Sequence, residues 1–251
     1  MRIISWNVNG IMPCLANGSL APLYGLKPDV VCLQETRTSK RPVVMPNCFH
    51  YWSSGERSGY AGVLSTSRKE PIDIQYGVGN SALDGEARLV VLEFDRCYSV
   101  NAYFPKAQAS IARHNYRMEW DEALREKLFM LDQLKPVILC GDFNITRSPL
   151  DVYPENERIA WAEQGYMSEE RESLEELLES GFTDVFRLLH PKLAGSYTWW
   201  SNRLNKRSQN RGWRLDYFCV SNRIVPYIKG MWHHTQIMGS DHCPIMLEID
   251  I

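Results

Sequence analysis

The chain has 251 residues, of which 44% are hydrophobic and 23% charged, and its formal net charge is −2. This length is enough to bury a full hydrophobic core, and we expect a single domain over residues 1–251. The near-zero net charge excludes a uniformly basic nucleic-acid-binding protein, so positive charge for such a partner must be concentrated locally.

Seven cysteines without a Cys-x-x-Cys pair favour reduced thiols over a disulfide framework. Strand-like residues begin at once after Met1, which leaves no room for a signal peptide. No apolar stretch approaches the length of a membrane span. We therefore expect an intracellular protein without a membrane partner, cytoplasmic and nucleoid-associated if the source is prokaryotic.

Short apolar runs rich in β-branched residues and bounded by turn formers predict eight strands. These runs are residues 2–8, 29–34, 61–66, 88–94, 97–104, 136–141, 214–220 and 244–249. Helical spacing of apolar residues predicts helices over 111–134, ended by Pro136, and over 168–180, ended by Gly181. Many strands with few helices favour an α/β or α+β fold, and we expect a two-sheet sandwich with helices outside.

One of these strands ends in Gly-Asp-Phe-Asn at residues 141–144. Asp142 and Asn144 are two apart on an extended chain, so their side chains can face one pocket. Gly-Asp and Asn also form ordinary turns after strands. This motif alone does not separate a turn from a functional site.

Polar residues follow or interrupt several other apolar strands. Asn7 and Glu35 stand at the ends of the first two runs, where a turn-capping amide and a solvated charge are the alternatives. Asp216 lies within an apolar strand, which favours an inward, paired carboxylate over one on a wet face. Asp241 and His242 form a pair in a Gly-bounded loop before the final strand. The recurrence favours one shared site.

Oxygen-bearing side chains dominate this set. Carboxylates and amides suit Mg²⁺, with Mn²⁺ able to substitute, far better than Zn²⁺. The cysteines are scattered through strands and offer no zinc cluster. The sequence therefore predicts a magnesium site.

Six motifs give the chain a resemblance to a known family. They are Trp6-Asn7-Val8-Asn9-Gly10, Leu33-Gln34-Glu35-Thr36, Asn101-Ala102-Tyr103-Phe104-Pro105, Gly141-Asp142-Phe143-Asn144, Gly212-Trp213-Arg214-Leu215-Asp216-Tyr217 and Gly239-Ser240-Asp241-His242-Cys243-Pro244. In this order they resemble the exonuclease III/AP endonuclease family of the endonuclease/exonuclease/phosphatase superfamily, and most of all its bacterial exonuclease A and archaeal exonuclease III type. The resemblance implies a four-layer α/β sandwich, with two mixed β-sheets packed face to face and flanked by helices.

The resemblance also implies roles for residues at matching positions. The implied metal ligands are Asn7, Glu35, Asp142, Asn144 and Asp241. The implied catalytic residues are Tyr103, Asp142, Asn144, Asp216 and His242. Asp142 would handle the proton of the attacking water, and Asn144 would help to hold that water. Tyr103 and His242 would contact the scissile phosphate, and Asp216 would orient His242.

Residues 198–214 include five basic side chains and no acidic one, interleaved with Trp199, Trp200 and Trp213. Such a mixture favours a nucleic-acid-binding loop, and a solvated loop with core tryptophans is the alternative. Basic residues also begin the helix after the Tyr103 loop. The expected DNA-binding residues are Lys106, Arg113, Trp200, Arg203, Arg211 and Trp213.

The chain departs from the family pattern at three places. Asn9 stands where some members have Asp, and Lys106 stands where the family usually has Asn. Residues 150–165 replace an Asn-rich run that lines the pocket for an abasic sugar. Chemistry at the phosphate is therefore expected to be retained, whereas recognition of abasic sites is open.

The resemblance implies a Mg²⁺-dependent DNA repair nuclease. Such an enzyme would hydrolyse the phosphodiester 5′ to abasic sites, with 3′–5′ exonuclease and 3′-end-cleaning activity, as a monomer on double-stranded DNA with abasic sites or blocked 3′ ends. One alternative is an exonuclease and 3′-phosphatase with weak or no abasic-site incision. Others are a catalytically silent nucleic-acid-binding relative and a phosphodiesterase acting on lipids or inositol phosphates.

Overall fold

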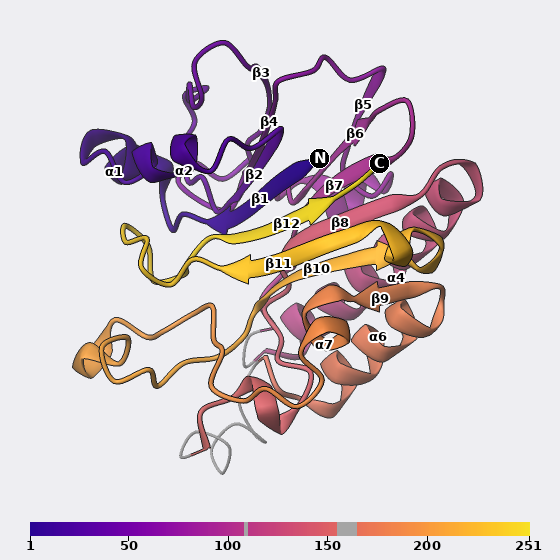
Figure 1. Ribbon diagram of the computed structural model, residues 1–251. Coiled ribbons are helices and arrows are strands. Elements are labelled where there is room, and N and C mark those ends of the chain that lie inside the picture. Colours follow the sequence, from indigo (N-terminus) through magenta and orange to yellow (C-terminus); the bar gives the residue numbers. More distant parts are fainter. Residues whose placement is uncertain (108–109, 155–164) are drawn as a thin grey trace.

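Two six-stranded sheets form the middle of the molecule in the computed structural model, which describes residues 1–107, 110–154 and 165–251 (Figure 1). The first sheet has the order β11 (Ile228–His233), β12 (Ile245–Ile249), β1 (Arg2–Asn7), β2 (Val30–Gln34), β4 (Val63–Ser67), β3 (Phe49–Ser53). The second has the order β5 (Asp73–Tyr76), β6 (Leu89–Glu93), β7 (Tyr98–Tyr103), β8 (Val137–Asp142), β10 (Asp216–Ser221), β9 (Phe182–Asp184). Both sheets are mixed, because β1–β2 and β7–β8 are parallel and the other pairs antiparallel.

Three buried clusters show that the layers number four. One cluster lies between the sheets and joins Ile3 to Ile138. A second places Trp120 and Leu174 against the second sheet, and a third places Ile11 against the first. The helices are α1 (Ile11–Ala16), α2 (Ala21–Gly25), α3 (Ser81–Asp84), α4 (Ile111–Leu134), α6 (Ser168–Glu179) and α7 (Val185–Leu189), with short 3-10 turns η1 (Pro149–Asp151), η2 (Arg203–Asn205) and η3 (Asn222–Tyr227). The expected α/β sandwich of two mixed sheets flanked by helices is confirmed.

All eight predicted strands are present, and β3, β5, β9 and β11 are additional. These four are the outer strands of the two sheets. An outer strand is covered on fewer sides, so its composition is more polar and its apolar run shorter. β5, for example, has two exposed and two half-buried residues. The apolar runs in the sequence therefore predicted the inner strands of both sheets and missed the four outer strands.

The two predicted helices agree with α4 and α6. Ser110 caps α4, where its hydroxyl accepts a hydrogen bond from the backbone N–H of Arg113. α6 begins at Ser168, and the Glu170 carboxylate accepts from the N–H groups of Gly165 and Met167 just before it. The segment 150–165 departs from the family pattern, and its residues 155–164 lie outside the described residues.

The central parallel strands of both sheets end at one side of the sandwich. β1 ends at Asn7 and Glu35 follows β2 directly, while β7 ends at Tyr103 and β8 at Asp142. β1 packs against β8, and β2 against β7 and β8, so the two pairs of ends face each other. Ligands in α/β folds bind outside the carboxyl ends of strands. The fold therefore brings these four side chains to the seam between the sheets.

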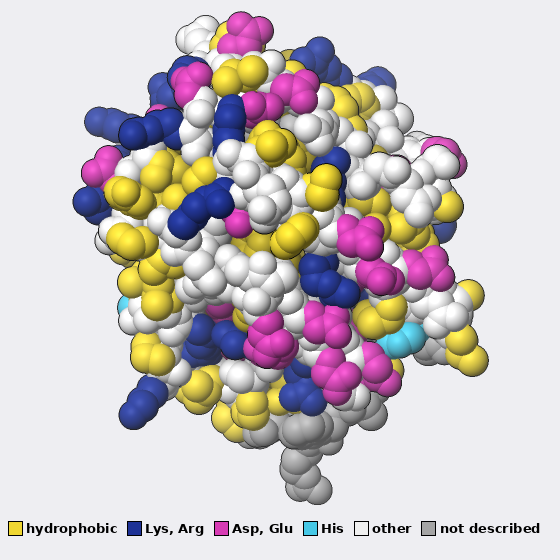
Figure 2. Space-filling view, turned by 90° about the vertical axis from the view of Figure 1, so that its right-hand side faces the viewer, with side chains coloured by type: hydrophobic (Ala, Val, Ile, Leu, Met, Phe, Trp, Pro, Cys, Tyr) yellow, Lys and Arg dark blue, Asp and Glu magenta, His cyan; other side chains and the backbone are white. Residues whose placement is uncertain are grey.

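Two loops flank the strand ends at the left of Figure 1: the orange loop of residues 199–213 and the yellow loop of residues 234–244. The right-hand side of the molecule shows basic and acidic side chains intermingled rather than a surface of one sign (Figure 2). All seven cysteines are free thiols. Of the helices in the described ranges, none is both long and apolar enough to cross a bilayer.

Candidate active site

Asp142 stands at the centre of the site, and its neighbours explain its position. A side chain at Gly141 would overlap the carbonyl oxygen of Ala102, so glycine permits β8 to approach β7 closely. Phe143 is stacked between Phe104 and Tyr217 and anchors the strand end in the core. The Asp142 carboxylate is 1% exposed, and its Oδ1 accepts from the Asn144 backbone N–H at 2.9 Å.

His242 lies between two carboxylates. Its Nδ1 is 2.8 Å from Oδ2 of Asp216, and its Nε2 is 3.8 Å from Oδ2 of Asp142. Burial alone would lower the pKa of His242, but Asp216 and then Asp142 raise this pKa to about 10. The imidazole is therefore protonated at neutral pH, with N–H groups on both sides. The prediction that Asp216 is inward and paired agrees with this contact.

The pKa of Asp142 is raised to about 7. Burial is the main cause and the Asp216 charge adds to it, whereas His242 and the hydrogen bonds from Asn7 and Asn144 oppose it. A carboxyl group with this pKa can take up a proton near neutral pH. One carboxylate oxygen each of Asp142 and Asp216 and one ring nitrogen of His242 all lie within 4.8 Å of one another. A protonated imidazole has no lone pair for a metal, so His242 suits contact with a phosphate and not the role of a metal ligand.

A second group of donors lies on the other side of Asp142. The Asn7 amide nitrogen donates to Oε2 of Glu35 at 2.8 Å and to Oδ2 of Asp142 at 2.7 Å. The Asn7 amide thus brings two carboxylates close together, and neighbouring carboxylate oxygens are suitable ligands for a hard divalent cation. The Asn7 oxygen instead accepts from the backbone N–H of Asn9 at 2.9 Å. In this arrangement Asn7 holds the carboxylates through N–H groups and does not present the oxygen expected of a ligand.

Glu35, Asn144 and Asn9 all have left-handed backbone conformations, with φ of 57°, 52° and 45°. Such conformations are strained for residues other than glycine, and they cluster at functional sites. Arg37 adds an ion pair to Oε1 of Glu35. Asn144 does not turn its amide nitrogen into the pocket but donates it to the Phe104 carbonyl at 3.0 Å.

These groups line one cavity of about 480 Å³. Its wall includes Asn9, Glu35, Arg37, Tyr103, Lys106, Asp142, Asn144, Gly165, Trp199, Ser201, Arg203, Lys206, Trp213, Leu215, Asp241 and His242. Tyr103 is 9% exposed, with the Arg88 guanidinium 4.5 Å from its ring centre. Burial, followed by the Glu35 charge, raises the pKa of Tyr103 well above its usual range. Tyr103 therefore stays a neutral hydrogen-bond donor.

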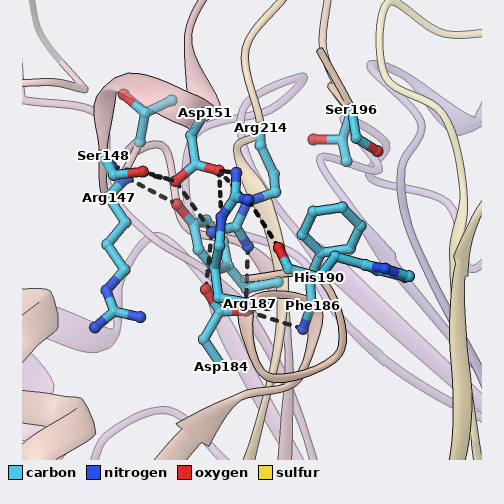
Figure 3. Close-up of polar contacts among 12 residues, drawn as sticks. Arg147, Ser148, Asp151, Asp184, Phe186, Arg187, His190, Ser196 and Arg214 are labelled. Carbon is cyan, nitrogen blue, oxygen red and sulfur yellow. Dashed lines mark hydrogen bonds and ion pairs between the residues drawn. The ribbon is translucent and has the colours of Figure 1, made fainter. Parts of the chain in front are cut away.

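A buried ion-pair network fixes the segment between Trp213 and Asp216 (Figure 3). The Arg214 guanidinium is fully buried and donates to Asp151 at 2.7 and 3.2 Å and to Asp184 at 2.8 and 3.2 Å. Arg187 adds a second cation on Asp151. Each carboxylate is thus compensated, which a buried charge requires. Arg214, although part of the basic stretch, holds the loop and does not face a ligand.

The predicted DNA-binding residues divide into two sets. Lys106, Arg203 and Trp213 line the cavity. Trp200 is 2% exposed, and its indole N–H donates to Asn210 inside the loop. Arg113 forms two hydrogen bonds to Glu86, at 2.7 and 2.8 Å. The third residue of this set, Arg211, stacks over the Tyr153 ring at 5.2 Å.

Arg207 and Arg117 also have internal partners. Arg207 donates to the backbone carbonyls of Thr235, Ile237, Ser240 and His242. Arg117 is 1% exposed and pairs with Asp121 on α4. Conversely, Arg37 and Leu215 line the cavity without having been expected there. Arg37 lies two residues after Glu35 in the sequence and Leu215 directly precedes Asp216, and this closeness could have placed both at the site.

Residues 4–242 match the model of the Endonuclease/Exonuclease/phosphatase family. The chain is 39% identical over 254 residues to the exodeoxyribonuclease of Bacillus subtilis (strain 168), with 100% of both covered. It is also 39% identical over 254 residues to the DNA repair nuclease APEX1 of Danio rerio, covering 98% of this chain and 81% of that one. The solved 3′ phosphatase NExo from Neisseria, bound to a product DNA hairpin, is 27% identical with a TM-score of 0.90, and 100% of both chains is covered. The similarity therefore extends along the whole chain.

Proposed function

The chain belongs to the endonuclease/exonuclease/phosphatase family and is a DNA-hydrolysing enzyme of DNA repair, and on that premise we propose its substrates and the roles of its residues. It hydrolyses the phosphodiester 5′ to abasic sites, and it also removes nucleotides and blocking groups from 3′ ends. The observation that carries this proposal is the position of the charged His242 between Asp216 and Asp142. The Asn7 amide joins Asp142 in turn to the Glu35 carboxylate.

The family is metal-dependent, and the specific metal proposed here is Mg²⁺, with Mn²⁺ as a substitute. Glu35, Asp142 and Asp241 would hold it through carboxylate oxygens, since they line one cavity. Asn144 completes the proposed set, and Asn7, although expected as a ligand, would support it by holding two of the carboxylates through its amide N–H groups. When bound, the cation supplies positive charge that stabilises the phosphoryl transition state and lowers the pKa of bound water.

The remaining chemistry belongs to the side chains of the chain itself. The His242 imidazolium and the Tyr103 phenol donate hydrogen bonds to phosphate oxygens, where charge develops during hydrolysis. Asp142 accepts the proton of the attacking water, which its pKa of about 7 permits. Asp216 acts through His242, because its charge keeps the imidazole protonated.

The proposed substrate is double-stranded DNA with abasic sites or blocked 3′ ends, bound by a monomer. Lys106, Arg203, Lys206 and Arg37 bring positive charge to the cavity wall, and phosphate contacts of this kind dominate nucleic-acid affinity. Trp199 and Trp213 add aromatic surface beside them. This local charge reconciles DNA binding with a net charge of −2.

A second candidate keeps the nuclease and lacks strong abasic-site incision, and Lys106 favours it. The Lys106 ammonium makes no ion pair with a carboxylate within the described ranges, so it is available for a terminal phosphate, which carries more charge than a diester. A silent DNA-binding relative is disfavoured, because no acid or histidine of the site is missing. The charged wall of residues 199–213 also disfavours lipid substrates.

A substrate panel tests these candidates. Abasic, 3′-phosphate, recessed and undamaged duplexes are compared in Mg²⁺ and in EDTA. The main proposal expects Mg²⁺-dependent cutting of the abasic duplex faster than of the undamaged duplex. Equal rates on these two, with rapid release of the 3′-phosphate, would select the second candidate. No Mg²⁺-dependent cleavage of any duplex would refute both.

A further inference from the structure

The Asp241 carboxylate is held by a side-chain hydrogen-bond donor on each of its two oxygens. Its Oδ1 accepts from the Asn9 amide at 2.9 Å, whereas the Ser240 hydroxyl, 3.2 Å away, has its shorter bond of 2.8 Å to the Asn7 carbonyl. Its Oδ2 accepts from the indole N–H of Trp199 at 3.0 Å. A carboxylate offers about four lone-pair sites, so lone pairs remain for a cation on both oxygens. The direction in which Asp241 presents these lone pairs depends on the Trp199 indole on one oxygen and the Asn9 amide on the other.

The Trp199 ring is fixed from both sides. Its backbone exchanges hydrogen bonds of 2.9 Å with Trp213, and the two rings meet edge to face at 6.2 Å. The next backbone N–H, that of Trp200, donates to the Asp241 carbonyl at 3.0 Å. Trp199 therefore belongs to the loop of residues 199–213 and is held against the loop that carries Asp241.

Arg207 strengthens the connection between these two loops. Its guanidinium donates to the carbonyls of Ser240 at 2.7 Å and His242 at 3.4 Å, on either side of Asp241. It also lies over the Trp200 ring at 4.7 Å. The indole N–H of Trp199 thus points at Asp241 because several independent contacts hold both loops in register.

A tryptophan that served only as a wall of the cavity would not need its N–H group. Phenylalanine would provide a similar apolar face towards a sugar or base, and the edge contact with Trp213 would survive. The N–H of Trp199 is instead directed to a carboxylate of the proposed cation site. Donors behind a ligand fix its orientation and set the affinity of the metal it binds.

We propose that Trp199 is a positioning residue for the metal site, which holds Asp241 by its indole N–H and thereby sets the affinity for the divalent cation. The proposal rests on the proposed function, since it takes Asp241 as a ligand. It assigns to one side chain both a place in the cavity wall and a hydrogen bond to a carboxylate that would hold the cation.

The test is Trp199→Phe, which removes the N–H and keeps an aromatic ring. Free Mn²⁺ is measured by electron paramagnetic resonance during titration of chelator-treated protein without DNA. We expect Mn²⁺ to bind about 10- to 100-fold more weakly than to the unsubstituted protein. The matched control is Trp52→Phe, on the outer strand β3, whose indole N–H has no partner within the described ranges. Its Mn²⁺ affinity should be unchanged.

Steady-state kinetics separate positioning from a role in DNA contact. Trp199→Phe should need a higher Mg²⁺ concentration for half-maximal kcat, and saturating Mg²⁺ should restore kcat and leave KM for DNA within about threefold. Unchanged Mn²⁺ affinity together with a raised KM at every Mg²⁺ concentration would overturn the inference and leave Trp199 a wall. Failure of the proposed function looks different, because the unsubstituted protein would then cut no DNA.

If Trp199→Phe does not fold, Asn9→Ala tests the same geometry from the Oδ1 side. Weakened Mn²⁺ binding with an unchanged melting temperature would support an Asp241 that depends on its donors. Unaltered Mn²⁺ binding in that variant would contradict it.

Discussion

Replacing Asp216 with asparagine should discharge His242 at neutral pH. The side chain keeps its shape, and the hydrogen bond from the backbone N–H of residue 216 to the Thr198 hydroxyl at 3.1 Å stays available. The pKa of His242 is about 10 against a usual 6.5, and burial alone would lower it. The difference of about 3.5 units corresponds to about 5 kcal/mol in favour of the imidazolium. Asp216 is the largest cause that raises this pKa.

Without the Asp216 charge, we expect the pKa of His242 to fall to about 6.5 or lower. At pH 8 only about 3% of the imidazole would then be charged, so kcat/KM should fall at least ~30-fold, and the deficit should shrink as the pH is lowered. NMR titration of metal-free protein gives the His242 pKa directly, with His242→Gln to assign the signal. Asp250→Asn, which removes a charge at an exposed residue just after the end of β12, is the control. A pKa that stays above 9 in Asp216→Asn would refute the reasoning.

Four further outcomes are expected. Arg214→Met leaves two buried carboxylates without their cation, so the free energy of unfolding in urea should fall by about 3–5 kcal/mol, and a loss below 1 kcal/mol would contradict the network. The pKa of His233 is lowered to about 3 because burial disfavours its charge, so stability should be full above pH 6.5 and decline by up to about 1.4 kcal/mol per unit as the pH falls from 6.5 towards 3. His233→Phe should flatten that decline in denaturation curves, and an identical slope would exclude His233 as its source. Asp142→Ala should lower kcat by about 10³-fold with an unchanged circular dichroism spectrum, and a loss under tenfold would mean that its role is misassigned. Lys106→Asn should raise kcat/KM on abasic duplex relative to 3′-phosphate duplex, and an unchanged ratio would place the preference elsewhere.

The covered parts of the fold were predictable from sequence because burial on two faces leaves a dense apolar run. The runs ending at Asn7 and Asp142 are of this kind, and the polar residue that follows each run stands out for the same reason. β5 and β11 are outer strands with mixed exposure, and their sequences carry no such contrast.

Pairing between distant residues was the part that sequence could not supply. Arg203 and Arg214 look equivalent in a basic stretch, yet one is exposed at the cavity and the other meets Asp151 and Asp184 in the interior. The carboxylates that neutralise Arg214 lie 63 and 30 residues away in the chain. Nor does a sequence reveal which end of the Asn7 amide faces Glu35.

The seam between the sheets makes the enzyme sensitive to a motion that leaves both sheets intact. Asn7 and Glu35 belong to one sheet, whereas Tyr103, Asp142 and Asp216 belong to the other. A sliding of one sheet over the other by about 1 Å would preserve every backbone hydrogen bond within the sheets and still separate the reacting groups. The catalytic rate therefore depends on how well the two sheets stay aligned. The aliphatic side chains packed between the sheets, such as Ile3 and Ile138, therefore contribute to catalysis by fixing the position of one sheet relative to the other.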